Sequence, residues 1–202
     1  MASQLDRLRQ NKVSYAKRHN YRYIEDTFGF HRHGNCHRVW NKIHAILKYL
    51  PDCKMLMWID TDAIFVNMEK SLESFMEPYP EIELIFTWYK KESMLNAGIF
   101  LVRGSPLVRE FFVNVTAGYA WTKNHCIYTR FEQSAINDQL KSGTVDGKYF
   151  YERTNAMQNL CGFGNRECLP TKTDFILHLA PPACPALGYL IKKFFDKNPQ
   201  FF

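Results

Sequence analysis

Apolar residues recur at helical spacing in several stretches of the chain. In residues 37–50 they form one stripe of a helix that ends at a proline, Pro51. This stripe consists of Val39, Trp40, Ile43, Ile46, Leu47 and Leu50. A second stripe predicts a helix over residues 107–115. The other predicted helices cover residues 4–18, 68–76, 131–140 and 187–195.

Apolar runs of strand length lie between these helices. The longest are residues 54–65 and 95–104. Shorter predicted strands cover residues 21–24, 83–88, 149–151 and 174–179. Strands and helices alternate, with no internal repeat and no low-complexity linker. We therefore expect an α/β fold with a mainly parallel central sheet and flanking helices, in a single domain over residues 1–202.

Two carboxylates interrupt the longest apolar run. Asp60 and Asp62 are separated by one residue, so on an extended chain they point to the same side. Paired carboxylates that lose hydration favour a bound cation, and oxygen ligands suit Mn²⁺ or Mg²⁺. With ordinary composition such a pair also arises by chance in roughly one chain of this size in two or three. Its place at the end of a buried strand is what points to a cation site.

Other polar residues lie at or near the ends of predicted strands. Asn96-Ala97-Gly98 opens one strand and His178 lies near the end of the last. Because ligands of such sheets bind beyond the carboxyl ends of the strands, we expect these residues to meet Asp60 and Asp62 at one site. His178 is either a third metal ligand or a hydrogen-bonded core histidine.

Two charged residues on predicted helices have two interpretations each. Glu132 lies at the start of a helix, where a carboxylate suits the positive end of the dipole, or it lines the floor of an active site with Gln133. Lys42 lies beside Trp40 on an apolar helix face. It is either a lysine whose stem packs while its ammonium reaches water, or one that reaches a diphosphate.

Histidines and cysteines allow further alternatives. His31, His33, Cys36 and His37 could be read as zinc ligands, but the second half of a finger-like spacing is missing, so a solvated or donor-facing loop is favoured. Cys161 and Cys168 flank a short loop and could be bridged, or geometry could forbid it.

Composition narrows the class of protein. The chain has 46% hydrophobic residues and a net charge of +6, as expected of a globular protein. The basic residues are scattered with no block of five or six, which argues against a nucleic-acid partner. No apolar run is long enough to cross a membrane, and the first residues do not form a signal peptide. Asn114-Val115-Thr116 is a glycosylation sequon that matters only in the secretory lumen.

Several segments resemble, in their order, the motifs of glycosyltransferase family 34, the galactosyl/mannosyl/xylosyltransferase family. The resemblance covers about residues 10 to 180. The segments are Asn11-Lys12, Tyr15 to Tyr21, Val39 to Ile43, Trp58 to Phe65, Asn96 to Arg103, Gln133-Ser134-Ala135 and His178-Leu179. The resemblance implies a GT-A fold, Mn²⁺ as cofactor, and transfer of a sugar from a nucleotide-sugar donor to a glycan acceptor with retention of configuration.

The resemblance also assigns roles by position. Asp60 and Asp62 match the metal-binding aspartates, and His178 matches the late metal ligand. The donor-binding segments correspond to Lys42, Asp60, Thr61, Asp62, Asn96, Ala97 and Gly98. Glu132 and Gln133 match the acidic–Gln pair near the anomeric carbon, with Glu132 where the family usually has Asp.

The same resemblance raises expectations about completeness. The first strand of the family's fold should lie before Gln4 and is missing, so we expect an N-terminally truncated chain. A full-length form would be anchored in the Golgi membrane and act in the lumen on a UDP- or GDP-sugar. The alternative function is a catalytically silent glycosyltransferase-like subunit that supports a partner enzyme.

Overall fold

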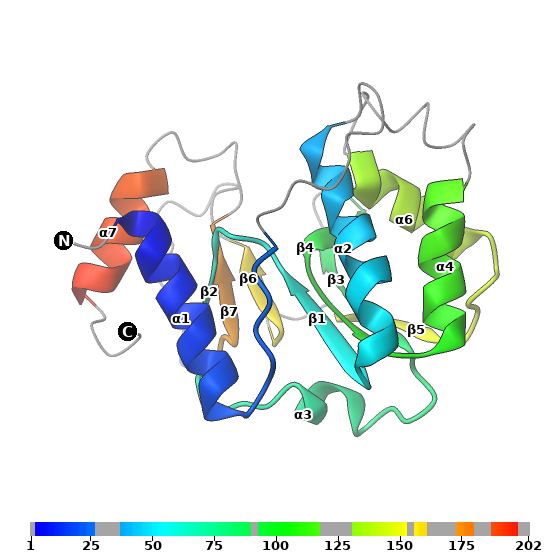
Figure 1. The fold of residues 1–202 in the computed structure, drawn as a ribbon, viewed down its shortest axis with the longest axis horizontal. Coiled ribbons are helices and arrows are strands. Elements are labelled where there is room, and N and C mark those ends of the chain that lie inside the picture. Colours follow the sequence, from blue (N-terminus) through cyan, green and yellow to red (C-terminus); the bar gives the residue numbers. More distant parts are fainter. Residues whose placement is uncertain are drawn as a thin grey trace. The chain divides into compact units, whose positions relative to one another are not determined.

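The structure of the protein is a computed structural model. It describes residues 3–26, 37–89, 93–117, 131–152, 156–160, 173–179 and 187–197. Contacts divide the chain into two compact units, each with its own sheet and helices (Figure 1). The first unit contains Met1–Ile24, Ile59–Ser74 and Thr154–Phe202; the second contains Glu25–Trp58 and Phe75–Arg153. The prediction of a single domain over residues 1–202 stays a prediction.

The first unit has a three-stranded sheet and two helices. Its elements are α1 (Gln4–Arg18), β2 (Ala63–Phe65), β6 (Gln158–Leu160), β7 (Ile176–His178) and α7 (Leu187–Lys197). The strand order is β2-β7-β6, with β2 antiparallel and β6 parallel to β7. Leu8 of α1 and Phe195 of α7 pack against Ile64 and Leu177 of the sheet, so both helices cover one face of it.

Helix α1 has the start that its sequence predicts. The hydroxyl of Ser3 accepts a hydrogen bond from the Asp6 backbone, and the Asp6 carboxylate accepts one in return, which makes a capping box. Tyr15 stacks on Phe65 of β2 with ring centroids 3.7 Å apart. Arg7 pairs with Asp196 of α7 at 3.4 Å. Capping and packing together place α1 along β2.

The second unit has a four-stranded sheet in the order β1-β4-β3-β5. Its strands are β1 (Met55–Ile59, whose last residue belongs to the first unit), β3 (Leu84–Tyr89), β4 (Met94–Arg103) and β5 (Tyr149–Glu152). Its helices are η1 (Arg38–Trp40), α2 (Asn41–Tyr49), η2 (Leu50–Asp52), α4 (Pro106–Ala117) and α6 (Phe131–Lys141), and α3 (Glu73–Met76) crosses the boundary. Apolar residues of α2, α4 and α6 form one core with Phe86 and Phe100 of the sheet.

The α/β prediction is confirmed, and both sheets contain antiparallel as well as parallel pairs. Strands β3 and β4 pair antiparallel, as do β2 and β7, whereas β3 and β5 pair parallel. Only residues 90–93 separate β3 from β4. A parallel pair needs a crossover of about a dozen residues or more, so this connection permits only a hairpin.

Other predicted elements differ in detail. The strand predicted at residues 21–24 is wrong, because residues 21–26 form neither helix nor strand. The Tyr21 hydroxyl instead hydrogen-bonds Glu73 and accepts from the Leu72 backbone at 3.0 Å, which holds this segment through a side chain. The helix predicted over residues 68–76 is only the four-residue α3, and β6 was not predicted.

Candidate metal and donor site

The two aspartates lie in a turn between two strands of different sheets. Strand β1 ends at Ile59 and β2 begins at Ala63, and the Ala63 backbone N–H donates to the Asp60 carbonyl at 3.2 Å. The prediction that Asp60 and Asp62 share one side of an extended strand is therefore wrong. The turn brings the two carboxylates together, because its hydrogen bond folds the backbone between them.

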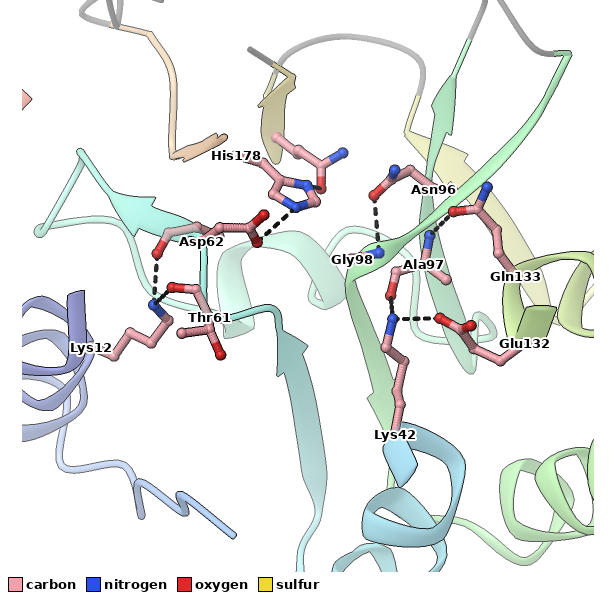
Figure 2. A network of polar contacts seen from close by, with 12 residues as sticks. Lys12, Lys42, Thr61, Asp62, Asn96, Ala97, Gly98, Glu132, Gln133 and His178 are labelled. Atoms are coloured by element: carbon pink, nitrogen blue, oxygen red, sulfur yellow. Dashed lines mark hydrogen bonds and ion pairs between the residues drawn. The ribbon is translucent and has the colours of Figure 1, made fainter. Parts of the chain in front are cut away.

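His178 joins the two carboxylates from the neighbouring strand. Ala63 and His178 are partners in the antiparallel register, and the Leu179 N–H donates to the Asp62 carbonyl at 3.0 Å. One ligand atom from each of Asp60, Asp62 and His178 can be chosen so that all three lie within 4.8 Å of one another. The sequence-predicted triad is thus assembled within the first unit, and Figure 2 shows Asp62 and His178 of it.

The imidazole of His178 is held from both sides. Its Nε2 lies 3.2 Å from the Asp62 Oδ1, and its Nδ1 lies 3.3 Å from the Oε1 of Gln158 on β6. The side chain is buried, at 3% exposure. His178 is therefore a hydrogen-bonded core histidine that also faces a carboxylate, and its role as a third metal ligand stays a prediction. A partner on Nδ1 orients the ring so that Nε2 can serve as a ligand.

The chemistry of these three side chains fits a divalent cation. Carboxylate oxygens suit Mg²⁺, Ca²⁺ and Mn²⁺, and a neutral imidazole nitrogen favours a transition metal among them. Asp60 and Asp62 are half-buried, so a bound ion would keep positions for ligands from outside the protein. Thr61, between them, is exposed. A set of two oxygens and one nitrogen is therefore chemically suited to a divalent metal ion.

Lys12 of α1 supports this turn, and its neighbour Asn11 holds the far end of β2; the sequence alone assigned neither residue a role of its own. The Lys12 Nζ donates to the carbonyls of Thr61 at 2.9 Å and Ala63 at 2.7 Å (Figure 2). The side-chain amide of Asn11 donates to the Phe65 carbonyl at 3.0 Å and accepts from the Phe65 N–H at 2.8 Å. The sequence contains a sign of these roles, because two polar residues occupy otherwise apolar positions on the buried stripe of α1. The stripe consists of Leu8, Asn11, Lys12, Tyr15 and Ala16.

The second unit holds the other predicted donor-site residues around an irregular part of β4. Phe86 pairs with Phe100, but the next residue, Thr87, pairs with Asn96. Residues 97–99 thus form a bulge without partners on β3, which releases their backbone groups from that ladder. The Gly98 N–H donates to the side-chain oxygen of Asn96 at 2.9 Å.

Lys42 and Glu132 form a buried ion pair beside this bulge. The Lys42 Nζ lies 2.8 Å from the Glu132 Oε1 and donates to the Ala97 carbonyl at 2.7 Å (Figure 2). Both side chains are 6% exposed. The interpretation of Lys42 as a lysine that reaches water is therefore wrong, because its ammonium is used inside the protein. Its ammonium also lies 5.5 Å from the centre of the Trp58 ring, within cation–π range.

Gln133 completes the support of the bulge from α6. Its Oε1 accepts a hydrogen bond from the Ala97 N–H at 2.9 Å. The residue before the Glu132–Gln133 pair, Phe131, has a φ of 46°, in the left-handed region that costs energy for a bulky residue. Its ring stacks on His37 with centroids 4.3 Å apart. The start of α6 thus holds Ala97 directly through Gln133 and indirectly through the pairing of Glu132 with Lys42.

Comparison with known proteins identifies the N-terminal part of the chain. Residues 1–80, which include Asn11, Lys42 and the Asp60–Asp62 turn, match the galactosyl transferase GMA12/MNN10 family. The recognition of glycosyltransferase family 34 from the motif order is thereby confirmed, although the motifs around Asn96, Glu132 and His178 lie beyond the matched range.

Curated relatives of the family agree with this assignment. Galactomannan galactosyltransferase 1 of Cyamopsis tetragonoloba is 30% identical over 112 residues, which make up 50% of this chain and 25% of that protein. Glycosyltransferase 6 of Arabidopsis thaliana is 31% identical over 104 residues, 46% of this chain and 23% of that protein. The chain spans about a quarter of the length of these relatives.

The fold has a match among solved structures. A glycosyltransferase involved in the glycosylation of the major capsid of PBCV-1 superposes with a TM-score of 0.70 over 94% of this chain and 92% of that one. The sequence identity is 16%, so the similarity concerns the fold. The GT-A-type α/β fold that the family resemblance implied is confirmed.

Some predictions fall outside the described residues. His31, His33 and Cys36 of the zinc alternative do so, as do both members of the Cys161–Cys168 alternative. His37 is described, and its Nδ1 accepts from the Val39 N–H at 3.4 Å at the start of η1. Within the described part of the chain, no helix has the length and apolar character needed to cross a membrane. The prediction that the donor-site residues of both units share one site stays a prediction.

Proposed function

We propose that this protein is a Mn²⁺-dependent glycosyltransferase that moves a hexose or pentose from a nucleotide-sugar donor to a glycan acceptor with retention of configuration. The observation that carries the proposal is the Asp60–Asp62–His178 triad, in a chain whose first 80 residues match a galactosyl transferase family. The two carboxylates and one imidazole would hold the ion. A bound divalent cation would supply positive charge to the diphosphate of the donor.

The side chains of the first unit have separate roles in this proposal. Asp60 and Asp62 provide oxygen ligands, and His178 provides Nε2 while its Nδ1 is oriented by Gln158. Thr61, exposed between the two aspartates, is available to the nucleotide. UDP- and GDP-sugars both carry the diphosphate that this arrangement recognises, so we leave the donor base open.

The side chains of the second unit act on the sugar mainly through backbone geometry. Lys42 and Gln133 hold the carbonyl and the N–H of Ala97, and Asn96 holds the N–H of Gly98. Glu132 fixes the ammonium of Lys42. We propose that Asn96, Ala97 and Gly98 line the donor pocket, and that Glu132 and Gln133 set the shape of that pocket next to the sugar. Lys42, tied to Glu132, orients this segment and does not itself bind the diphosphate.

The cellular setting follows from the family resemblance. We propose that a full-length form acts in the Golgi lumen, anchored to the membrane, in a complex with another glycosyltransferase. The sequon Asn114-Val115-Thr116 lies on α4, with the Thr116 hydroxyl bonded to the Val113 carbonyl at 2.7 Å. Co-purification of a second glycosyltransferase from membranes of the source organism would test the complex.

The central experiment measures binding and hydrolysis of UDP- and GDP-sugars with and without Mn²⁺, in the unmodified chain and in Asp62→Ala. We expect Mn²⁺-dependent binding, weakened by more than about 100-fold in the variant, because loss of a direct ligand exceeds the effect of altering a supporting residue. Asp146→Ala, which changes an exposed aspartate of the second unit, should behave like the unmodified chain.

Three outcomes would contradict parts of this proposal. Nucleotide-sugar turnover that is equal without Mn²⁺, or equal in Asp62→Ala, would contradict the metal-dependent mechanism. Mn²⁺-dependent nucleotide binding with no turnover on any donor or acceptor would favour the catalytically silent subunit instead.

A further inference from the structure

Lys12 is a buried cation that points at the backbone of the Asp60–Asp62 turn. It lies on the buried face of α1 and is 5% exposed. Its Nζ donates to the carbonyls of Leu8 at 3.4 Å, Thr61 at 2.9 Å and Ala63 at 2.7 Å. Burying an ammonium is costly unless its donors find acceptors. These carbonyls supply acceptors, so Lys12 and the turn stabilise one another.

The carbonyls of the turn have partners at four consecutive positions. The Asp60 carbonyl accepts from the Ala63 N–H, and the Asp62 carbonyl accepts from the N–H of Leu179, the residue after β7. The two remaining carbonyls, of Thr61 and Ala63, both accept from Lys12. One ammonium therefore fixes the peptide unit just before Asp62 and the unit just after Ala63 (Figure 2). Asp62 cannot rotate its backbone without breaking one of these bonds.

We infer that Lys12 is a positioning residue of the metal site: its ammonium holds the turn in the conformation that brings the carboxylates of Asp60 and Asp62 to the imidazole of His178. The inference rests on the proposed function, since it concerns the same site. Second-sphere contacts of this kind change metal affinity by about 10- to 100-fold when removed. Lys12 reaches the ligands through the backbone, and that is how it differs from Gln158, which contacts the His178 ring.

The charge of Lys12 and its hydrogen bonds are expected to change the affinity for Mn²⁺ in opposite directions. A fixed ammonium near a cation site repels a divalent ion, so removing only its charge would tighten Mn²⁺ binding. Removing the hydrogen bonds that shape the turn would weaken binding. The inference requires that weakening be the net result in Lys12→Met, which has a similar stem but neither charge nor donors.

The experiment titrates the full chain with Mn²⁺ and follows the electron paramagnetic resonance signal of the free ion, which disappears on binding. We expect Lys12→Met to weaken Mn²⁺ binding about 10- to 100-fold. Lys12→Gln retains an amide donor on a shorter stem, so it should show a smaller loss of Mn²⁺ affinity. This variant also provides the test if Lys12→Met does not fold. Lys17→Met, an exposed lysine on the same helix, should bind Mn²⁺ like the unmodified chain.

Asn11→Ala separates positioning from a general loss of stability. It removes two buried hydrogen bonds from the same helix, but those bonds go to Phe65, at the far end of β2 from the turn. We expect Asn11→Ala to lower the denaturation midpoint in urea while Mn²⁺ affinity changes less than threefold. The Lys12 variants should lose affinity out of proportion to their loss of stability.

The outcomes distinguish this inference from the proposed function. If the unmodified chain binds Mn²⁺ and folded Lys12→Met or Lys12→Gln binds it equally or more tightly, the positioning role is wrong and the metal site stands. Equal weakening in Asn11→Ala would likewise show that Lys12 acts only through stability. If the unmodified chain does not bind Mn²⁺, the metal site itself is wrong, and with it this role of Lys12.

Discussion

Each unit uses a buried lysine to hold an irregular piece of backbone, but the two lysines are balanced differently. Lys42 donates to one carbonyl, of Ala97, and forms an ion pair with Glu132. Lys12 donates to three carbonyls, of which two belong to the Asp60–Asp62 turn. Both are 5% exposed, so burial alone does not separate them.

The difference lies in what surrounds each ammonium. The Glu132 carboxylate lies 2.8 Å from the Lys42 ammonium and neutralises its charge. The ion pair that supports the β4 bulge therefore carries no net charge. Lys12 donates to carbonyls of a turn whose two carboxylates are directed to a cation. The first arrangement suits a pocket wall that must be rigid. The second suits a site that changes its charge when an ion binds.

The largest expected loss of stability comes from breaking the ion pair between Lys42 and Glu132. Glu132→Ala leaves the Lys42 ammonium buried without its carboxylate, and loss of one partner of a buried pair costs about 3–5 kcal/mol. We expect a loss of this size in the free energy of unfolding, measured by urea denaturation. Since the Ala97 carbonyl still accepts from Lys42, the result should fall toward the lower end.

The double variant Lys42→Met/Glu132→Leu tests the reason for that loss. Replacing both partners by apolar side chains removes the unpaired charge, so it should cost less than Glu132→Ala alone. The remaining cost comes from the Ala97 carbonyl, which loses its donor. A double variant that is no more stable than Glu132→Ala would mean that the two side chains do not form a pair that matters to stability.

The elements were predictable where hydrophobic periodicity was strong. The predicted helix over residues 4–18 coincides with α1, and the strand over residues 95–104 became β4, Met94–Arg103. Their long apolar patterns leave few alternatives. Strand pairing was harder, because the parallel prediction rested on alternation of elements, whereas the short connection between β3 and β4 decides their direction.

The site was predictable in its residues but not in its geometry. Asp60, Asp62 and His178 were found from residue type, position at strand ends and motif order, and the structure brings them together. That Asp60 and Asp62 occupy a turn depends on long-range contacts with Leu179 and Lys12, which a local pattern does not contain. The pairing of Lys42 with Glu132 spans 90 residues, and only the fold brings them together.

A smaller effect is expected from the other contact of the β4 bulge. Gln133→Met keeps the length of the side chain but loses the oxygen that accepts from the Ala97 N–H. Leaving a buried donor unpaired costs about 1–3 kcal/mol, and this contact is only partly buried, so we expect about 1 kcal/mol in urea denaturation. Gln133→Glu keeps the acceptor and is the matched control. A Gln133→Met protein as stable as the control would mean that Ala97 is held by Lys42 alone.

The smallest expected effect on stability concerns the contacts of Tyr21 with Leu72 and Glu73, which follow β2 in the first unit. It appears only at alkaline pH. Burial, with the hydrogen bond to Glu73, raises the pKa of Tyr21 to about 12, above the value of about 10 for an unfolded chain. The folded state therefore keeps the phenol proton where the unfolded state has lost it. The contribution of Tyr21 to stability is complete below pH of about 10 and is lost as the pH rises toward 12.

Comparison with Tyr21→Phe isolates this contribution. The unmodified chain should lose its advantage in urea denaturation over Tyr21→Phe as the pH rises through this window, while the lysines titrate in both proteins and cancel. Burial is the largest cause of the raised pKa of Tyr15 and is present in both proteins, whereas the smaller part that comes from Tyr21 belongs to the measured difference. A constant difference between the two proteins across the window would mean that the Tyr21–Glu73 contact does not depend on the proton. A difference that narrows would show that the neutral phenol of Tyr21 holds the segment after β2. The Asp60–Asp62 turn and the β4 bulge are instead held by the buried ammonium groups of Lys12 and Lys42.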